Sequence, residues 1–285
     1  MQILRYAAFT TVPNGGNPAG VVLDATGASD AEMQRVAADV GYSETAFLVP
    51  GAEPGAFAVR YFSPLAEVPF CGHATIASAV AHAQRNGAGP LRFATAAGPV
   101  AVRTDEDATG TITATLVSVP PRTVALAPAD LDELLAALDW SAADLDPTLP
   151  PRVAFAGAWH PVLAAATRAR LADLDYDFDR LGALMAARDW TTVALLYREH
   201  PTLWHARSPF PPGGVREDPA TGAAAAAVGG YLRELGQVRR PDTITVHQGD
   251  DLGRPGVLTV GIPADPDAGI AVSGAAVRLP DPEPA

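Results

Sequence analysis

Short apolar runs bounded by glycine, proline and other turn residues alternate along the chain with longer stretches that have helical spacing. The short runs, rich in Val, Ile, Thr and aromatic residues, predict β-strands, and the longer stretches predict helices. Ser29 precedes one such stretch and is the expected N-cap of its helix. The pattern therefore predicts a protein of the α+β class. Helices are expected over residues 30–40, 72–85, 127–138, 177–187 and 222–235; strands are expected over 3–9, 20–23, 45–49, 56–62, 91–95, 98–104, 109–117, 153–155, 161–165, 191–197, 202–206, 243–248, 257–262 and 270–279.

The order of these elements repeats within the chain. Each half contains strands, a polar motif that ends in glycine, an Ala-rich helix and then a strand pair. The motifs are Phe70-Cys71-Gly72-His73-Ala74-Thr75 and Glu217-Asp218-Pro219-Ala220-Thr221-Gly222, and a boundary falls near Val119-Pro120-Pro121-Arg122. We therefore predict two related domains, over residues 1–119 and 120–269, and a single small-molecule site that both motifs face.

The charge of the chain excludes several classes of partner. The formal net charge is −12 and the pI is about 4.8, which disfavours binding to nucleic acid or to an anionic membrane.

The lack of lysine excludes further chemistry. All 20 basic residues are Arg, so Schiff-base chemistry, covalent pyridoxal phosphate and a Walker-type lysine are excluded. A small anionic substrate remains compatible with the charge, because backbone N–H groups can bind it locally.

Cysteine and histidine usage argues against metal and disulfide chemistry. Cys71 is the only cysteine, and none of the six histidines has the spacing of a common metal motif. We predict no metal and no cofactor. The N-terminus lacks signal-peptide features and no apolar run has the length of a membrane span, so a cytoplasmic location is expected.

Gly72 and Gly222 are at the starts of the two Ala-rich helices, and these helix starts are the strongest indication of a binding site in the sequence. The first N–H groups of a helix have no partners within it and carry partial positive charge, so they can bind a carboxylate. Glycine there lets a ligand approach the backbone. The alternative is ordinary capping, in which Asp218 or Thr221 satisfies the second helix alone.

Three side chains are candidates for acid/base work, each with a plain structural alternative. Glu44 directly precedes an apolar strand, where burial would raise its pKa toward neutrality, or it is a solvated strand-end acid. Cys71 is either a thiol activated at a helix start or a small buried residue. Thr221 stands at the matching place in the second half, which excludes a symmetric two-thiol racemase. His73 is either a proton shuttle or a structural histidine.

A set of motifs resembles the phenazine-biosynthesis isomerase family (PhzF-like), in the same order as in that family. The resemblance implies a fold like diaminopimelate epimerase, with mixed strands wrapped around a central helix in each of two similar domains. It also implies that the strand at 270–279 rejoins the first domain and that the protein is a homodimer. The motifs are Gly16-Asn17-Pro18-Ala19-Gly20-Val21-Val22, Ser43-Glu44-Thr45-Ala46-Phe47, Arg60-Tyr61-Phe62-Ser63-Pro64, Glu67-Val68-Pro69-Phe70-Cys71-Gly72-His73-Ala74-Thr75, Glu217-Asp218-Pro219-Ala220-Thr221-Gly222-Ala223-Ala224, Gln248-Gly249 and Gly253-Arg254-Pro255-Gly256.

The family's best-known activity is isomerisation of trans-2,3-dihydro-3-hydroxyanthranilate, a proton shift without metal or organic cofactor. By resemblance, Glu44 matches the acid/base glutamate, and His73 and Asp218 match polar residues that assist the proton relay. The substrate-binding positions implied are Cys71, Gly72, Thr221, Gly222 and Ala223. At position 223 this chain has Ala where Ser is commoner in the family, which removes one hydroxyl from the site.

The leading hypothesis is therefore a cofactor-independent isomerase acting on a small cyclic or conjugated carboxylate. A one-thiol epimerase or racemase using Cys71 is an alternative, which alkylation of Cys71 would test. A non-catalytic protein that binds a small acid is a third hypothesis, and it predicts no exchange of carbon-bound protons with deuterated water.

Overall fold

The computed structural model describes residues 1–281, and its contacts divide the chain into two compact units. Unit 1 comprises Met1–Val117 and the segment from Ser273, and unit 2 comprises Ser118–Val272. That each predicted half is an independent domain stays a prediction from the sequence. Among the described residues, no helix is both long enough and apolar enough to cross a membrane.

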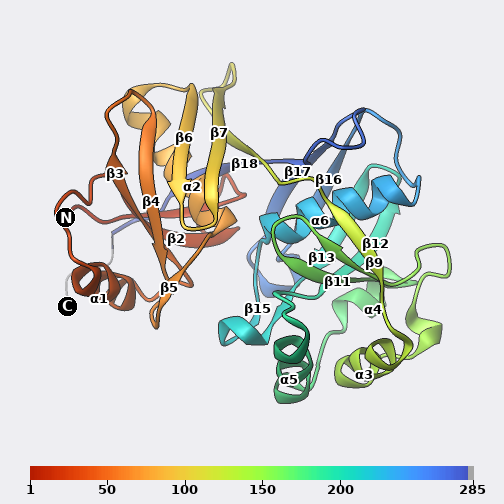
Figure 1. Ribbon diagram of the computed structural model, residues 1–285. Helices are drawn as coiled ribbons and strands as arrows, with labels where there is room; N and C mark the ends of the chain where they lie inside the picture. The colour runs from red at the N-terminus through yellow and green to blue at the C-terminus, as the bar shows by residue number, and fades with distance from the viewer. Residues whose placement is uncertain (282–285) are drawn as a thin grey trace. The chain divides into compact units, whose positions relative to one another are not determined.

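Unit 1 is a sheet that closes on itself around helix α2 (Figure 1). The strand order is β1-β2-β3-β4-β6-β7-β8-β18, and β18 also pairs with β1, so the last strand joins the two ends. The bounds are β1 Leu4–Ala8, β2 Asn17–Val22, α1 Asp30–Val40, β3 Thr45–Pro50, β4 Ala56–Phe62, β5 Glu67–Val68, α2 Gly72–Asn86, β6 Pro90–Thr95, β7 Gly98–Glu106, β8 Ile112–Val117 and β18 Ala271–Arg278.

Unit 2 has a sheet with helix α6 on one face and helices α3 and α5 near the other. The strand order is β17-β16-β13-β12-β11-β10-β9. The bounds are β9 Arg122–Ala125, α3 Pro128–Leu138, β10 Arg152–Phe155, β11 Trp159–Ala164, α4 Arg168–Ala172, α5 Phe178–Arg188, β12 Ala194–His200, β13 Leu203–Arg207, β14 Pro209–Phe210, β15 Val215–Glu217, α6 Gly222–Glu234, β16 Asp242–Gln248 and β17 Gly256–Ile262, with 3₁₀ turns at Ala142–Asp144, Pro211–Gly213 and Asp250–Leu252.

Alternation along β12 separates the two apolar layers of unit 2. Leu195 belongs to the core cluster formed with α3 and α5, whereas Ala194 and Leu196 line a cavity beside α6. Neighbouring residues of a strand point to opposite faces, so one strand serves both layers. Most residues of α6 are Ala or Gly, so neighbouring side chains can approach the helix closely. A Cβ added at Gly229 would lie 2.8 Å from the Ile270 side chain.

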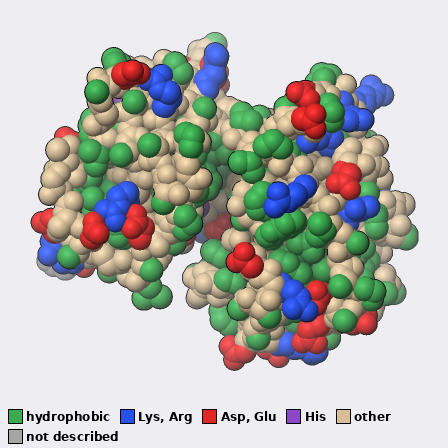
Figure 2. All heavy atoms as spheres, viewed as in Figure 1, with side chains coloured by type: hydrophobic (Ala, Val, Ile, Leu, Met, Phe, Trp, Pro, Cys, Tyr) green, Lys and Arg blue, Asp and Glu red, His purple; other side chains and the backbone are tan. Residues whose placement is uncertain are grey.

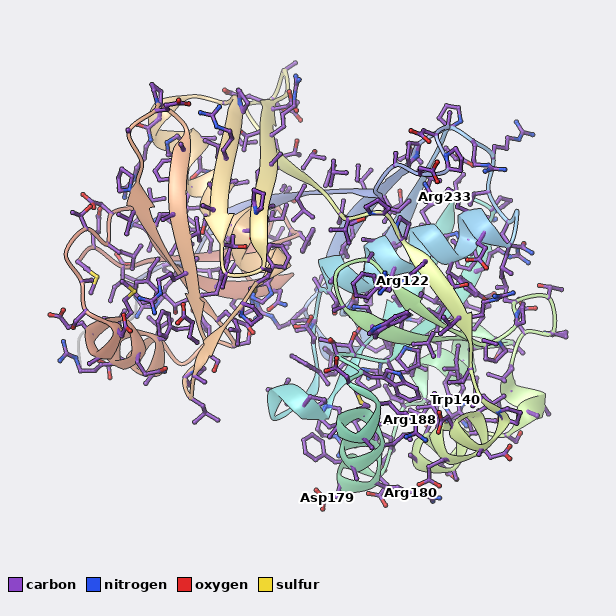
Figure 3. The ribbon with its side chains drawn as sticks, in the orientation of Figure 1. Arg122, Trp140, Asp179, Arg180, Arg188 and Arg233 are labelled. Carbon is purple, nitrogen blue, oxygen red and sulfur yellow. The ribbon has the colours of Figure 1, made fainter. Side chains whose placement is uncertain are left out.

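Charged side chains on α3 and α5 of unit 2 form ion pairs. In Figure 2, acidic and basic side chains alternate over the lower part of unit 2, where α3 and α5 lie. Arg180 pairs with Glu133 and Arg188 with Asp130, and each pair joins α5 to α3. Figure 3 labels both arginines on α5. Ion pairs at the surface stabilise a protein little individually, and in these two pairs each arginine charge is matched by a carboxylate.

Candidate active site

Glu44 ends the loop before β3, and its side chain is only 14% exposed. Its backbone carbonyl accepts a hydrogen bond from Gly20 of β2, which fixes where the loop enters the sheet. Burial raises the pKa of the Glu44 carboxyl, and hydrogen bonds from Ser43 and Cys71 offset part of that rise. A carboxyl group with a raised pKa holds and releases a proton more readily near neutral pH than an exposed glutamate does.

His73 lies against Glu44 in the first turn of α2. Its Nε2 is 3.4 Å from Glu44 Oε2 and 3.4 Å from Ser43 Oγ. Its Nδ1 is 3.1 Å from the side-chain nitrogen of Asn17. When the Asn17 amide donates to Nδ1, the imidazole proton resides on Nε2 and points toward Glu44. His73 as a whole is 6% exposed, so the geometry couples a carboxyl and an imidazole away from bulk water.

Cys71 is the N-cap of α2 and makes no side-chain capping bond. Its Sγ lies 3.4 Å from His73 Nδ1 and 3.8 Å from Nε2. Its carbonyl accepts from the Thr75 hydroxyl at 2.7 Å, and that hydroxyl also contacts the Tyr61 hydroxyl at 2.7 Å. These buried bonds fix the helix start, so the thiol, the imidazole and the Glu44 carboxyl form one cluster in unit 1.

A second polar cluster lies at the start of α6 in unit 2. The Thr221 hydroxyl donates to Asp218 Oδ2 at 2.5 Å, and Thr221 makes no capping bond to the helix. The alternative in which Thr221 caps α6 is therefore wrong, because the hydroxyl is bonded to the aspartate instead. Gln248 accepts from Thr221 N at 3.1 Å, and its amide nitrogen donates to Asp218 O at 2.8 Å and to Thr221 Oγ1 at 3.0 Å. Gln248, which is 2% exposed, thus fixes the loop that carries Asp218.

A buried ion pair also holds the strand that leads into Asp218. Arg207 of β13 forms two N–H bonds to Glu217 Oε2, at 2.6 and 3.2 Å, and one to Oε1 at 3.0 Å. It also donates to Ala172 O at 2.6 Å. The two side chains are 9% and 4% exposed. Because bidentate pairs restrict both partners, the strand that leads into Asp218 is rigidly placed.

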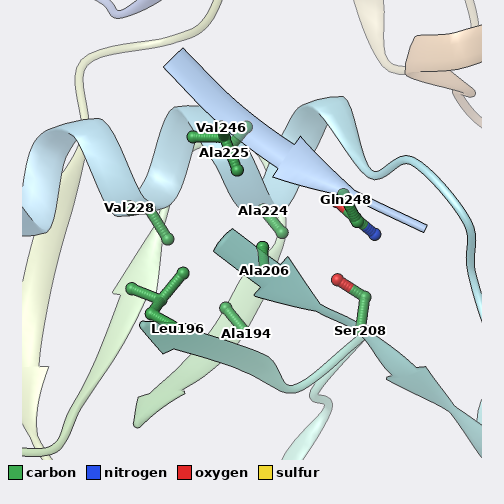
Figure 4. A pocket seen from close by; sticks show the side chains of 9 residues that line it. All are labelled: Ala194, Leu196, Ala206, Ser208, Ala224, Ala225, Val228, Val246 and Gln248. Atoms are coloured by element: carbon green, nitrogen blue, oxygen red, sulfur yellow. The ribbon is translucent and has the colours of Figure 1, made fainter. Parts of the chain in front are cut away.

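A small cavity lies beside this second cluster, between α6 and the sheet (Figure 4). It offers about 10 Å³ to the centre of a water molecule, which is about the room that one water needs. Ser208 and Gln248 supply polar atoms at one end, as Figure 4 shows, and the rest of the lining is aliphatic. The lining residues are Ala194, Leu196, Ala206, Ser208, Ala224, Ala225, Val228, Val246 and Gln248.

The site residues expected from the sequence thus fall into two groups. Glu44, Cys71, Gly72 and His73 come together in unit 1, while Asp218, Thr221, Gly222 and Ala223 lie together at the start of α6 in unit 2. That one substrate contacts both groups stays a prediction.

Three residues that contact the site, Asn17, Ser43 and Gln248, were not assigned a role from the sequence. Asn17 and Ser43 contact His73, and Gln248 binds Asp218 and Thr221. Each of these residues lies within one of the family motifs, so the motifs indicated that the positions matter. Nothing in the local pattern, however, said which distant side chain each would meet.

Similarity to known proteins covers nearly the whole chain. The family model PhzC-PhzF, described as phenazine biosynthesis-like protein, matches residues 6–281. An uncharacterized isomerase of Deinococcus radiodurans is 35% identical over 263 residues, covering 90% of this chain and 85% of the relative. A trans-2,3-dihydro-3-hydroxyanthranilate isomerase of Pseudomonas chlororaphis is 30% identical over 253 residues, covering 88% of this chain and 86% of the relative.

Solved structures agree with this assignment. The PhzF-family phenazine biosynthesis protein of Bacillus anthracis matches with a TM-score of 0.88 and 26% identity, covering 98% of both chains. A hydroxyproline epimerase of Agrobacterium vitis matches with a TM-score of 0.62 and 15% identity, covering 98% of this chain and 91% of the other. The predicted α+β, diaminopimelate epimerase-like fold is thereby confirmed. The chain belongs to the PhzC-PhzF family of phenazine biosynthesis-like proteins, as its motifs predicted.

Proposed function

We propose that this protein is an isomerase that moves a proton between carbon atoms of a small conjugated carboxylate, with no metal or organic cofactor. The observation that carries the proposal is the Glu44 carboxyl, which is largely buried, has a raised pKa and lies 3.4 Å from His73 Nε2. The kinship with isomerases, including one that acts on trans-2,3-dihydro-3-hydroxyanthranilate, supports the reaction class.

In the proposed reaction, ionised Glu44 removes a proton from an activated C–H bond, and the electron pair moves into the conjugated system. The protonated Glu44 then returns the proton to a different carbon of the same substrate. His73 donates from Nε2 to the Glu44 carboxylate and keeps it oriented. Such positioned acid/base catalysis typically contributes about 10²–10⁴-fold in rate.

The starts of α2 and α6, at Gly72 and Gly222, are proposed to bind substrate carboxylate through backbone N–H groups. Helix N-termini favour anions, and neither N-cap residue occupies its helix start with a side-chain capping bond. Asp218 is proposed to assist proton transfer, as the family resemblance implies. Ala223 supplies no hydroxyl, so the substrate is expected to lack a hydrogen bond at that position.

The test is proton exchange in deuterated water, followed by NMR, with trans-2,3-dihydro-3-hydroxyanthranilate and a panel of small unsaturated and amino carboxylates. We expect the wild type to incorporate deuterium into one or more of these acids and Glu44→Gln to lose at least about 10²-fold in turnover. Glu53→Gln, which makes the same change at a carboxyl that is 76% exposed, is the matched control. Undiminished exchange in Glu44→Gln would remove Glu44 from the mechanism.

One observation favours a second candidate, a one-thiol epimerase. Cys71 Sγ lies within hydrogen-bond reach of His73, and a neighbouring imidazole can accept a thiol proton. Under this hypothesis, iodoacetamide or Cys71→Ser abolishes exchange at the α-carbon of an amino acid. Full activity after complete alkylation would eliminate it.

A further inference from the structure

Glu44, Cys71 and His73 bring together three different metal-ligand types. One donor atom from each side chain can be chosen so that all three lie within 4.8 Å of one another. The carboxylate comes from the loop before β3, and the thiol and imidazole come from the start of α2. Among the described residues this is the one group of three or more such side chains that meets this distance. Sequence spacing could not reveal it, because Glu44 is remote from the other two along the chain.

Two of the three donor separations are close to those of a tetrahedral zinc site, and the third, between Cys71 Sγ and a Glu44 oxygen, is within 4.8 Å. Bonds of about 2.3 Å to sulfur and about 2.0–2.2 Å to nitrogen and oxygen place tetrahedral ligands about 3.4–3.6 Å apart. His73 Nε2 and Glu44 Oε2 are 3.4 Å apart, and Cys71 Sγ and His73 Nε2 are 3.8 Å apart. The last pair therefore needs to close by only a few tenths of an ångström. Three protein ligands leave the fourth position to water.

Charge and surroundings also suit a divalent cation. A thiolate and a carboxylate together carry two negative charges, which Zn²⁺ neutralises, while the imidazole binds as the neutral base. With Nε2 bound to the metal, Nδ1 carries the proton. Asn17 lies 3.1 Å from Nδ1, and rotation of its amide group presents an oxygen that accepts this proton. Such outer hydrogen bonds orient metal-bound histidines.

We propose that Glu44, Cys71 and His73 form a binding site for Zn²⁺ and similar thiophilic divalent cations, and that the bound ion blocks isomerisation. The binding part stands on the three ligands alone. The blocking part rests on the proposed function, because the cation would occupy the carboxylate that must accept the substrate proton. The site is thus inhibitory, and bound zinc would switch the enzyme off reversibly.

The first experiment measures binding without any substrate. Metal-free protein is titrated with Co²⁺ under anaerobic conditions, and absorption is followed for the thiolate-to-cobalt charge-transfer band and the visible bands of tetrahedral cobalt. Zn²⁺ is then added to displace Co²⁺. We expect one equivalent of Co²⁺ to produce both signals and one equivalent of Zn²⁺ to remove them. Absence of a thiolate band in the wild type would overturn the proposal, whatever the variants do.

Variants identify the ligands, with circular dichroism confirming that each is folded. Cys71→Ser should abolish the charge-transfer band, and Glu44→Gln should keep the band but weaken zinc binding by at least about 10–100-fold. His205→Asn is the matched control, because His205 contacts Glu199 and Asp250 elsewhere in unit 2. Equal zinc affinity of the wild type and Cys71→Ser would refute the site.

A second experiment separates this inference from the proposed function. Wild-type exchange activity is measured with Zn²⁺ and again after removal by a chelator. A thiolate band together with chelator-reversible inhibition supports both parts of the proposal. A band without inhibition of an active enzyme overturns the blocking part. If the enzyme is active but shows no thiolate band, the metal site is overturned and the isomerase proposal is left intact. If the protein shows the thiolate band but exchanges protons of no tested acid, the result supports the metal site and counts against the isomerase proposal.

Discussion

Gly249 allows a sharp test of how the second polar cluster is held in place. Its φ is +87°, in the left-handed region, and a Cβ at this position would lie 2.3 Å from Arg254 O and 2.7 Å from Pro219 O. Gly253, at the other end of the same 3₁₀ turn, has φ +68° and open space around its Cβ position. The two glycines therefore share the backbone strain of an alanine substitution but differ in the clash.

The magnitudes follow from these two terms. Gly253→Ala meets only the left-handed penalty, about 1–2 kcal/mol. Gly249→Ala meets the same penalty and must also displace two backbone carbonyls, and overpacking of this kind costs about 1–3 kcal/mol more. Because Pro219 directly follows Asp218, its displacement shifts the aspartate, so Gly249→Ala should also lower turnover whereas Gly253→Ala should not.

Tryptophan fluorescence is the appropriate assay. All four tryptophans, Trp140, Trp159, Trp190 and Trp204, lie in unit 2, so urea and thermal unfolding followed by this signal report on the unit that contains both glycines. The difference between the variants should shift the melting temperature by roughly 2–12 °C, at about 2–4 °C per kcal/mol for a unit of this size. Equal stability of the two variants would refute the argument that the carbonyl contacts decide the cost.

Three further predictions concern buried ionisable groups. Burial lowers the pKa of His160 from 6.5 to about 4, so unit 2 should lose about 3 kcal/mol of stability as the pH falls from 6.5 to 4. Urea midpoints followed by tryptophan fluorescence should show this pH dependence in the wild type and not in His160→Gln. If the pH dependence persists in the variant, another group causes it. Glu217→Gln leaves the Arg207 charge buried without its partner and should lower the stability of unit 2 by about 3–5 kcal/mol in the same assay. Replacing both residues by Leu and Met should recover most of that stability. A loss below about 1 kcal/mol in Glu217→Gln would contradict this reading. The pKa of Glu44 is raised above the ordinary value of a glutamate, so kcat/KM should fall as the pH drops through that raised pKa. A pH profile of kcat/KM that is flat down to pH 4 would exclude Glu44 as the base.

Local signals in the sequence predicted α1, α2, α3, α5 and α6, because a capping residue, a proline or a glycine stands at the start of each of these helices. Ser29 forms the expected capping box with Glu32 at the start of α1, and Pro128 opens α3. The starts of α2 and α6 fall at Gly72 and Gly222, as predicted. β9 and α4 were not predicted: β9 is mostly exposed and so lacks a buried apolar pattern, and the five residues of α4 are too few for a helical period to be visible.

The site contacts could not be predicted from local pattern, because they depend on which strands become neighbours. Asn17 reaches His73 because β2 packs against α2. Gln248 reaches Thr221 because β16 ends beside the loop before α6. Family motifs indicated that Glu44 and His73 belong together, whereas the local sequence left open whether Glu44 is buried or is a solvated strand-end acid. The buried position follows from the register of β3, which places its first residues inside the sheet.

The return of β18 to unit 1 has a consequence for how the chain folds during its synthesis. Unit 2 is a continuous segment and can complete its contacts once residue 272 has emerged, but the sheet of unit 1 closes only when β18 joins β1 and β8. Until then both strands present unpaired edges, which are prone to pair with other chains. The first part to be translated is therefore the last to be finished, and early truncation before Ser273 would leave an aggregation-prone product.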